Sequence, residues 1–252
     1  MKSPDASEAL LLVGVNPISE QLRRDPRAVR KLFVARGVGG KAVEIAAQAK
    51  DAGLEVAQES TRRLDELAGG IPHQGLVAVL RGYEYADWVD LLERKPACVL
   101  IADQINDPRN LGALLRSAEA TGVGAVIIPK DRSVSVTAAV AKAAAGATTL
   151  VPVARVVNLA RALEELKRAG YWVVGLDGDA PRTIFEFSFP DLCALVVGAE
   201  GKGLRPLTRA TCDHLVSIPM LGRIESLNVS VAGAVALYER VRQRGGKRVS
   251  TD

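Results

Sequence analysis

The second half of the chain alternates short, apolar, β-branched runs with segments of helical periodicity, and no other feature constrains the fold as much. Such alternation is typical of a mainly parallel β-sheet with helices on both faces. Ligands of these sheets bind beyond the carboxyl ends of the strands. The pattern predicts strands at 99–103, 125–128, 150–152, 172–176, 192–197 and 214–218, and helices at 111–121, 136–145, after Asn158 and through Arg244.

A smaller α/β unit precedes this region. Its pattern predicts strands at 31–35, 55–57 and 75–80, with helices at 41–51 and after Ser60. Asn16 and Pro17 fit the N-cap and first turn of a short helix that ends at Arg24. Residues 82–96 are polar and aromatic and end in a proline, which is typical of a linker with one short helix. We therefore expect two α/β domains, 1–81 and 97–252, joined by a linker at 82–96.

The composition argues against several classes of protein. With 48% hydrophobic and 25% charged residues, the chain is not of the disordered type. No apolar run is long enough for a membrane span, and Asp5 and Glu8 do not fit a signal peptide, so we expect a cytoplasmic protein without a membrane partner. Three cysteines and two histidines, with no CxxC pair, predict no metal site. GxGxxG and GxxxxGK[ST] are absent, so a nucleotide-like cofactor would bind by another route.

Basic residues gather near the start of the chain. Arg23, Arg24 and Arg27 surround a single acid, Asp25. A cluster of this kind suits a polyphosphate partner, because each phosphate contact releases a counterion. A solvated helix end is the alternative interpretation.

The first unusual loop of the second half runs from Asp103 to Gly112 and leads into a helix that carries Arg116. The apolar stripe of this helix lies about 140° from Arg116 by helical geometry. Arg116 is therefore free to face a cleft or plain solvent. Asn110, taken alone, fits an N-cap of the same helix. The stripe consists of Leu111, Leu114, Leu115 and Ala118.

Two further loops carry glycine and polar side chains. Residues 198–203 follow a strand directly, and their three glycines allow close backbone approach or positive φ around Glu200. Residues 218–230 lead into the last helix and contain Ser226, Asn228 and Ser230. One side chain is enough to cap a helix, so the additional polar residues indicate a pocket.

Together the three loops resemble the three motifs of the SpoU (TrmH) family of RNA ribose 2′-O-methyltransferases, within the SPOUT superfamily. The motifs are NDPRNLGALLRSAEATGV (106–123), LVVGAEGKGL (195–204) and IPMLGRIESLNVSVAGAVALYE (218–239). PKDRS (129–133) and LTR (207–209) sharpen the match towards bacterial members that methylate a guanosine ribose in large-subunit ribosomal RNA. The first half is similar to the family's ribosomal-protein-like substrate-binding domain, with His73-Gln74-Gly75 before its last strand.

The resemblance implies a fold, a cofactor and partners. It implies a SPOUT-type α/β domain with a deep trefoil knot, which general topology rules argue against. It also implies S-adenosylmethionine as cofactor, RNA as substrate and a homodimer. The cofactor is then expected at Val197, Gly198, Gly201, Ile218, Met220, Ser226 and Leu227, and the catalytic set is Asn110, Arg116, Glu200, Ser226 and Asn228. RNA contacts are expected from Arg23, Arg24, Arg27, His73, Arg109 and Arg116.

A guanidinium is effectively always protonated, which argues against Arg116 as a general base. We expect Arg116 instead to hold a phosphate of the target nucleotide and to stabilise the developing alkoxide. Three alternatives stay open at this point: the same chemistry on transfer RNA, the same chemistry on a ribosomal adenosine as in antibiotic-resistance relatives, and a non-catalytic ribosome assembly factor. For the first domain, a dimerisation or stability module is the alternative to RNA binding.

Overall fold

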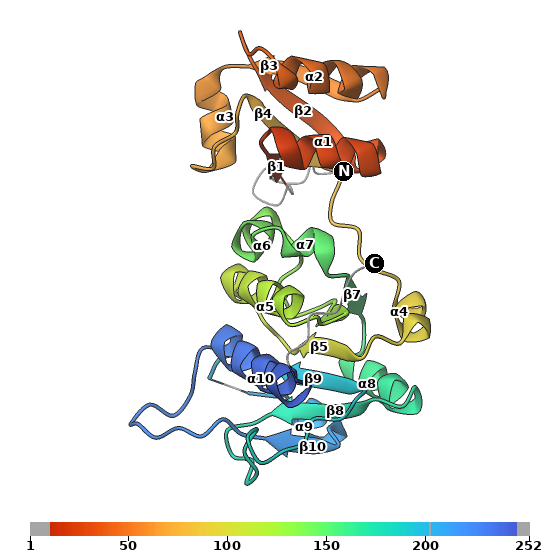
Figure 1. Ribbon diagram of the computed structural model, residues 1–252, viewed down its shortest axis with the longest axis vertical. Coiled ribbons are helices and arrows are strands. Elements are labelled where there is room, and N and C mark those ends of the chain that lie inside the picture. Colours follow the sequence, from red (N-terminus) through yellow and green to blue (C-terminus); the bar gives the residue numbers. More distant parts are fainter. Residues whose placement is uncertain (1–10, 202, 246–252) are drawn as a thin grey trace. The chain divides into compact units, whose positions relative to one another are not determined.

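The computed structural model describes residues 11–201 and 203–245. The chain divides into two units, Met1–Glu84 (unit one) and Tyr85–Asp252 (unit two) (Figure 1).

Unit one has a four-stranded mixed sheet in the order β1-β4-β2-β3. Strand β2 pairs in parallel with β3, whereas β4 runs antiparallel to both β1 and β2. Leu64 and Val77 are buried at the centre of a small apolar cluster between the third helix and the sheet. The elements are β1 (Leu11–Val13), α1 (Val15–Arg24), a 3-10 turn (Pro26–Ala28), β2 (Val29–Ala35), α2 (Lys41–Asp51), β3 (Glu55–Glu59), α3 (Thr61–Ala68) and β4 (Leu76–Leu80).

The N-cap predicted at Asn16 is wrong. Helix α1 begins at Val15, and its N-cap is Gly14, whose φ of 99° lies in a region that L side chains rarely adopt. Gly14 donates its N–H to the carbonyl of Leu76, so the chain turns from β1 straight into the helix with no side-chain cap. The helix predicted after Ser60 is confirmed as α3, and the Ser60 side chain caps it by accepting a hydrogen bond from the Arg63 N–H.

Unit two has a six-stranded sheet in the order β10-β8-β9-β5-β6-β7, and every strand pair in it is parallel. The predicted parallel α/β architecture is confirmed. The elements are α4 (Trp88–Arg94), β5 (Cys98–Ala102), α5 (Pro108–Ala120), β6 (Ala125–Pro129), α6 (Ala138–Ala144), α7 (Ala147–Leu150), β7 (Val153–Val156), α8 (Leu159–Arg168), β8 (Trp172–Leu176), β9 (Cys193–Val197), α9 (Pro206–Thr211), β10 (His214–Val216) and α10 (Val229–Gln243).

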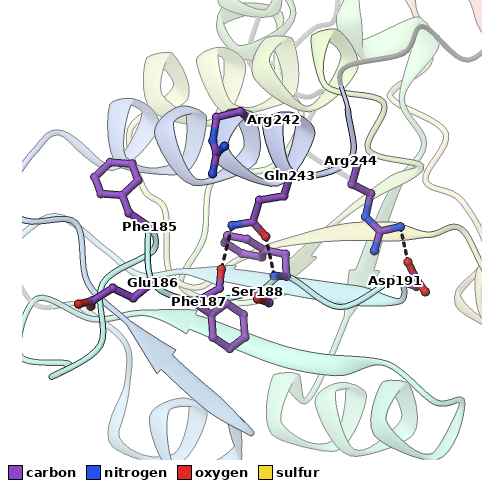
Figure 2. Close-up of a pocket in the computed structure, with 9 residues that line it drawn as sticks. Phe185, Glu186, Phe187, Ser188, Asp191, Arg242, Gln243 and Arg244 are labelled. Carbon is purple, nitrogen blue, oxygen red and sulfur yellow. Dashed lines mark hydrogen bonds and ion pairs between the residues drawn. The ribbon is translucent and has the colours of Figure 1, made fainter.

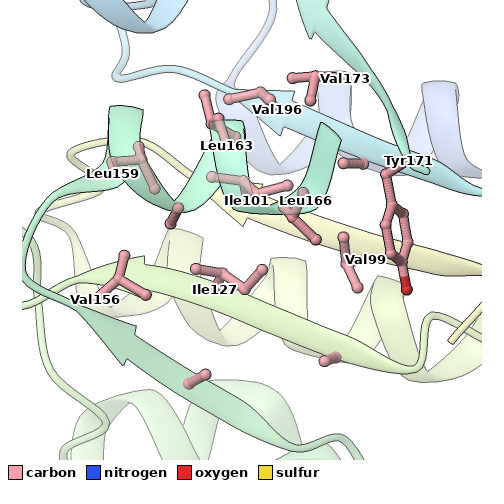
Figure 3. Close-up of a cluster of buried hydrophobic side chains, with 14 of the residues drawn as sticks. Val99, Ile101, Ile127, Val156, Leu159, Leu163, Leu166, Tyr171, Val173 and Val196 are labelled. Atoms are coloured by element: carbon pink, nitrogen blue, oxygen red, sulfur yellow. The ribbon is translucent and has the colours of Figure 1, made fainter. Parts of the chain in front are cut away.

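One face of this sheet is covered by α8. Its Leu159, Leu163 and Leu166 lie over Ile101 and Ile127 in one continuous apolar core (Figure 3). Helices α5, α6 and α10 pack together elsewhere in the unit, where Gly233 of α10 leaves room for Leu114 of α5. Full burial of the central strands explains why their sequences are continuously apolar rather than alternating.

Two details of the prediction change in this unit. The strand predicted at 150–152 is wrong: the N–H of Val151 still donates to Ala147 of helix α7, and strand β7 begins after Pro152. Proline has no N–H to give to a sheet, which explains the shift. The short helix predicted within the linker 82–96 is confirmed as α4, but it packs on the core of unit two through Trp88 and Leu91.

Strand order reverses between β5 and β9. The chain runs from β5 outward through β6 to β7, then crosses to β8, β9 and β10 on the other side of β5. In open parallel sheets, ligands bind beyond the carboxyl ends of the strands at such a reversal. The segments that follow β5 and β9 therefore occupy the place where a site is expected.

Candidate active site

The three unusual loops meet at the carboxyl ends of β5, β9 and β10. Asp103, directly after β5, donates its N–H to the carbonyl of Val197 at the end of β9 (2.8 Å). Ser217, directly after β10, donates its N–H to the carbonyl of Arg182 in the segment after β8. Backbone hydrogen bonds therefore join the origins of the first two loops to each other, and the origin of the third loop to the segment after β8.

The glycine loop after β9 folds back on itself at very close range. A Cβ atom on Gly198 would lie 2.2 Å from the carbonyl carbon of Gly203, closer than any real contact. Gly203 donates its N–H to Ala199 (2.9 Å), and Gly201 and Gly203 have φ of 71° and 63°. These positions need glycine for two reasons, because Gly198 lacks space and the other two have left-handed backbone.

A cavity of about 790 Å³ lies against this loop. Its wall combines the end of β8, the glycine loop, the segment after β10 and the start of α10. The lining includes the entire set of cofactor-binding residues expected from the resemblance, namely Val197, Gly198, Gly201, Ile218, Met220, Ser226 and Leu227. A pocket of this size that combines backbone groups, apolar side chains and the carboxylates of Asp177, Asp179, Glu200 and Glu225 suits an adenosine-like ligand with ribose hydroxyls.

Asn228 connects all three loops through one side-chain amide. Its Nδ2 donates to Oδ1 of Asn110 (2.9 Å) and also to Oε1 of Glu200. Its Oδ1 accepts from the N–H groups of Ser230 and Val231 and thereby caps helix α10. Three of the five expected catalytic residues thus form one cluster, and we refer to Asn110, Glu200 and Asn228 as the amide–carboxylate cluster.

Asn110 does not cap helix α5. Asp107 has that role, accepting from the Arg109 N–H, and Pro108 occupies the first turn. The side chain of Asn110 is instead buried and committed to Asn228. Asn110 is therefore a member of the amide–carboxylate cluster and not the N-cap of α5.

Ser226 and Arg116 complete the expected catalytic set. Ser226 is exposed and lines the cavity. Arg116 is exposed on α5, as its position opposite the buried stripe predicted. In the described part of the chain, no hydrogen bond or ion pair joins Arg116 to the amide–carboxylate cluster.

Sequence reasoning missed an ion pair between the buried Asp103 and the half-buried Arg205, which joins the first two loops. Asp103 is 1% exposed, and its Oδ1 lies 2.7 Å from Nε of Arg205. Its other oxygen accepts the Arg205 N–H (3.3 Å), so Asp103 holds the exit of the glycine loop against the start of the β5 loop. An acid directly after a fully apolar strand was the signal available in the sequence.

The expected RNA-binding residues lie in different surroundings. Arg23, Arg24 and Arg27 are exposed in unit one. Arg109 is exposed in unit two, but pairs with Asp107 (3.2 Å). His73 is buried and both ring nitrogens are engaged, Nε2 with Asp65 and Nδ1 as acceptor of the Gly75 N–H. The two ring nitrogens thereby fix the turn before β4, and the expected RNA contact of His73 stays a prediction.

A second hollow, of about 590 Å³, lies between the end of α10 and residues 185–191. Figure 2 shows Gln243 directed at the backbone of this segment, where it donates to Phe187 and accepts from Phe189. Arg244 pairs with Asp191 (2.5 Å) and Arg242 with Glu239 (2.8 Å). Because Arg242, Gln243 and Arg244 already have partners within the chain, this hollow shows no built ligand site.

Two negative findings concern residues 11–201 and 203–245. No helix among them is both long and apolar enough to cross a bilayer. Nor do they contain a group of three or more His, Cys, Asp or Glu side chains that could hold a metal ion.

A parallel sheet with a glycine loop, a cavity and an amide–carboxylate cluster at its carboxyl ends defines an α/β protein built to bind a nucleotide-like ligand. Comparison with known families gives a more specific result. The model of the SpoU rRNA Methylase family matches residues 97–238, and that of the RNA 2′-O ribose methyltransferase substrate-binding domain matches residues 11–86. The chain belongs to the SpoU rRNA methylase family.

Individual relatives agree with this membership. The 23S rRNA (guanosine-2′-O-)-methyltransferase RlmB of Bordetella pertussis is 46% identical over 241 residues, covering 94% of this chain and 98% of the relative. RlmB of Xylella fastidiosa is 44% identical over 239 residues, covering 92% and 96%. The SpoU methyltransferase AviRb of Streptomyces viridochromogenes, solved with the cofactor AdoMet, is 28% identical, covers 96% of this chain and 92% of its own, and has a TM-score of 0.75.

Proposed function

We propose that this protein transfers a methyl group from S-adenosylmethionine to the ribose 2′-oxygen of a guanosine in 23S ribosomal RNA. The observation that carries the proposal is the cavity beside the amide–carboxylate cluster, formed by the same three loops that carry the family motifs. The relatives named RlmB match nearly the whole chain, which supports the guanosine and the ribosomal RNA. Such a substrate also implies a cytoplasmic protein.

The residues present fit the proposed cofactor. Gly198 has no room for a side chain because the backbone of Gly203 lies against it, so the glycine loop stays folded on itself along the wall of the cavity. Met220 and Leu227 are only partly exposed and offer apolar surface to a purine ring. When bound, S-adenosylmethionine supplies a methyl group on a positively charged sulfur. Within this chain, Val197, Gly198, Gly201, Ile218, Met220, Ser226 and Leu227 are the residues proposed to hold it.

The amide–carboxylate cluster provides alignment. Methyl transfer requires the attacking oxygen to lie in line with the methyl group, and fixed polar groups reduce the entropy lost in reaching that geometry. Asn228 fixes both Glu200 and Asn110, leaving the second carboxylate oxygen of Glu200 as an acceptor for a ribose hydroxyl. We assign Arg116 to the phosphate of the target nucleotide and to the developing negative charge on oxygen, because a guanidinium does not readily accept a proton.

The exposed arginines Arg23, Arg24 and Arg27 of unit one are proposed to contact RNA phosphates. Replacing all three by alanine is expected to weaken RNA binding and reduce its salt dependence, while S-adenosylmethionine affinity is unchanged. Calorimetry with the cofactor and RNA titrations at several salt concentrations measure the two effects. Unchanged RNA affinity would instead favour the dimerisation or stability role for this unit.

We also propose a homodimer that uses helix α10. Val231 and Tyr238 are 47% and 54% exposed, and their spacing of seven places them on one face of the helix. Leu221 and Ile224, in the preceding segment, are exposed as well. Light scattering at micromolar concentration is expected to give twice the chain mass. The deep trefoil knot expected from the family resemblance likewise stays a proposal.

The decisive experiment is methylation of defined RNA. The purified protein with radiolabelled S-adenosylmethionine is incubated with unmodified 23S ribosomal RNA and with transfer RNA, and the labelled nucleotide is then mapped. Label at one ribosomal guanosine ribose is the expected result. Label on transfer RNA or on an adenosine would support the alternative substrates, and binding of RNA without any label would support a non-catalytic assembly factor.

A further inference from the structure

The loop that follows strand β6 contains the motif Pro129-Lys-Asp-Arg-Ser, which the proposed chemistry does not use. Strands β5 and β6 are parallel neighbours, so this loop lies at the same edge of the sheet as the loop after β5. The two loops are joined directly at Ile105. Its carbonyl accepts hydrogen bonds from the N–H of Val134 (2.8 Å) and from the hydroxyl of Ser133 (3.1 Å).

This loop has a fixed conformation. Arg132 has a φ of 57°, a left-handed conformation that is uncommon for residues other than glycine and is concentrated at functional sites. Lys130 donates its N–H to Val156, and its carbonyl accepts from Nη2 of Arg155 (2.9 Å). At the far end, the N–H of Val136 donates to the hydroxyl of Tyr85 (2.8 Å). The backbone is therefore held at both ends and in the middle.

The side chains presented by this loop are positively charged. Lys130 and Arg132 are exposed, and among the described residues neither takes part in an ion pair. By contrast, Arg205 of the same unit pairs with Asp103, and Arg209 pairs with Asp177. The guanidinium of Arg155, which lies over the Tyr85 ring (4.9 Å to its centre), adds positive charge beneath the loop. Asp131 is the single acid between the two exposed cations.

We propose that Lys130 and Arg132 bind backbone phosphates of the RNA next to the methylated nucleotide. The inference rests on the proposed function for its ligand. Strand β6 lies two strands from β9, which is about 10 Å at the usual spacing of neighbouring strands. An RNA strand whose target ribose lies at the amide–carboxylate cluster therefore passes within reach of this loop. Rigid presentation of two unpaired cations suits phosphates, because little side-chain and backbone freedom is lost on binding.

The test uses a double variant, Lys130→Gln with Arg132→Asn, in the full-length protein. Asparagine tolerates left-handed backbone, so the loop keeps its conformation while two charges are removed. With unmodified 23S ribosomal RNA as probe, affinity is expected to fall about tenfold or more at 0.1 M salt, and the slope of log affinity against log salt to decrease by about 1.5. Affinity for S-adenosylmethionine is expected to stay at the parent value.

The matched control is Arg94→Gln with Arg168→Gln. These exposed arginines end helices α4 and α8, just before strands β5 and β8 begin, and so lie near the opposite edge of the sheet. The control removes the same charge and is expected to bind RNA nearly as the parent does. Equal RNA affinity of the loop variant and the control would overturn the proposal.

Two further measurements make the result specific. If the parent binds this RNA but does not methylate it, the proposed function fails, while the binding experiment still decides the role of the loop. A change in molecular mass of the loop variant by light scattering would assign Lys130 and Arg132 to a contact between copies of the chain, and would likewise overturn the proposal.

Discussion

Replacement of Asn228 by aspartate separates the two tasks of this side chain. The new carboxylate keeps an oxygen that can cap α10, but it removes the Nδ2 donor and places a second acceptor beside Glu200. Asn110 can rotate its side-chain amide and donate a hydrogen bond to the new carboxylate, whereas the Glu200 carboxylate has no proton to donate to it. Loss of the hydrogen bond costs about 1 kcal/mol, and repulsion of two solvated carboxylates at about 4 Å adds about 1 kcal/mol. We expect the free energy of unfolding to fall by about 2 kcal/mol at pH 8.

The dependence on pH tests this reasoning. The repulsion is present where both carboxyls are ionised and is relieved as the pH falls towards 4, because the pair then takes up a proton. Urea unfolding of the parent and the variant at pH 8 and pH 4 measures the difference. Asn228→Ala is the control: it loses the cap and both hydrogen bonds, about 2–3 kcal/mol in total, with little dependence on pH. A loss for Asn228→Asp that is the same at both pH values would refute the assigned contacts.

The cavity wall, the end of α10 and the arginine on α5 give three further predictions. Gly198→Ala is expected to destabilise the protein by about 1–3 kcal/mol and to abolish cofactor binding in calorimetry, because the new Cβ meets backbone. Gly178 lines the same cavity but has open space around it, so Gly178→Ala is expected to change neither stability nor cofactor binding. Arg242 and Gln243 lower the pKa of the buried Glu239 to about 2, so its stabilising contribution is present above its usual pKa and lost as the pH falls towards 2. For Glu239→Gln, the loss of unfolding free energy between pH 7 and pH 3 is expected to be about 2 kcal/mol smaller than for the parent, and an identical acid profile would contradict this. Arg116→Ala is expected to reduce single-turnover methylation by about 10²–10³ with cofactor affinity unchanged, and Arg116→Lys to retain partial activity; a steep rise of the Lys variant with pH would indicate a base instead.

Much of the fold followed from periodicity. The strand at 172–176 and the helix at 41–51 have the predicted bounds, because continuous apolar runs and a regular 3.6-residue pattern leave few alternatives. The errors arose at the starts of α1 and β7, where the backbone properties of a single residue set the boundary of the element. Gly14 replaces Asn16 as a cap because the chain turns at positive φ, and Pro152 delays β7 because it lacks an N–H.

The candidate site was predictable in its residues but not in its connections. The resemblance identified Asn110, Glu200 and Asn228, yet local sequence also allowed each to be a cap or a loop residue. Only the folded chain shows that one amide holds the other two side chains across separations of 118 and 28 residues. Such long-range pairing has no local periodicity. Asp103 was missed for the same reason, since its partner Arg205 is 102 residues away.

The double use of Asn228 gives the site a spectroscopic signature. Ser230 and Val231 point their amide protons at Oδ1 of Asn228, while the other end of that amide holds Glu200 and Asn110. Because the Asn228 side chain holds both, the first turn of α10 and the amide–carboxylate cluster open together in a single local fluctuation. Amide hydrogens exchange with solvent only when such a fluctuation occurs. A ligand that settles against Glu200 or Asn110 consequently slows hydrogen exchange at Ser230 and Val231, two backbone positions that the ligand itself never touches.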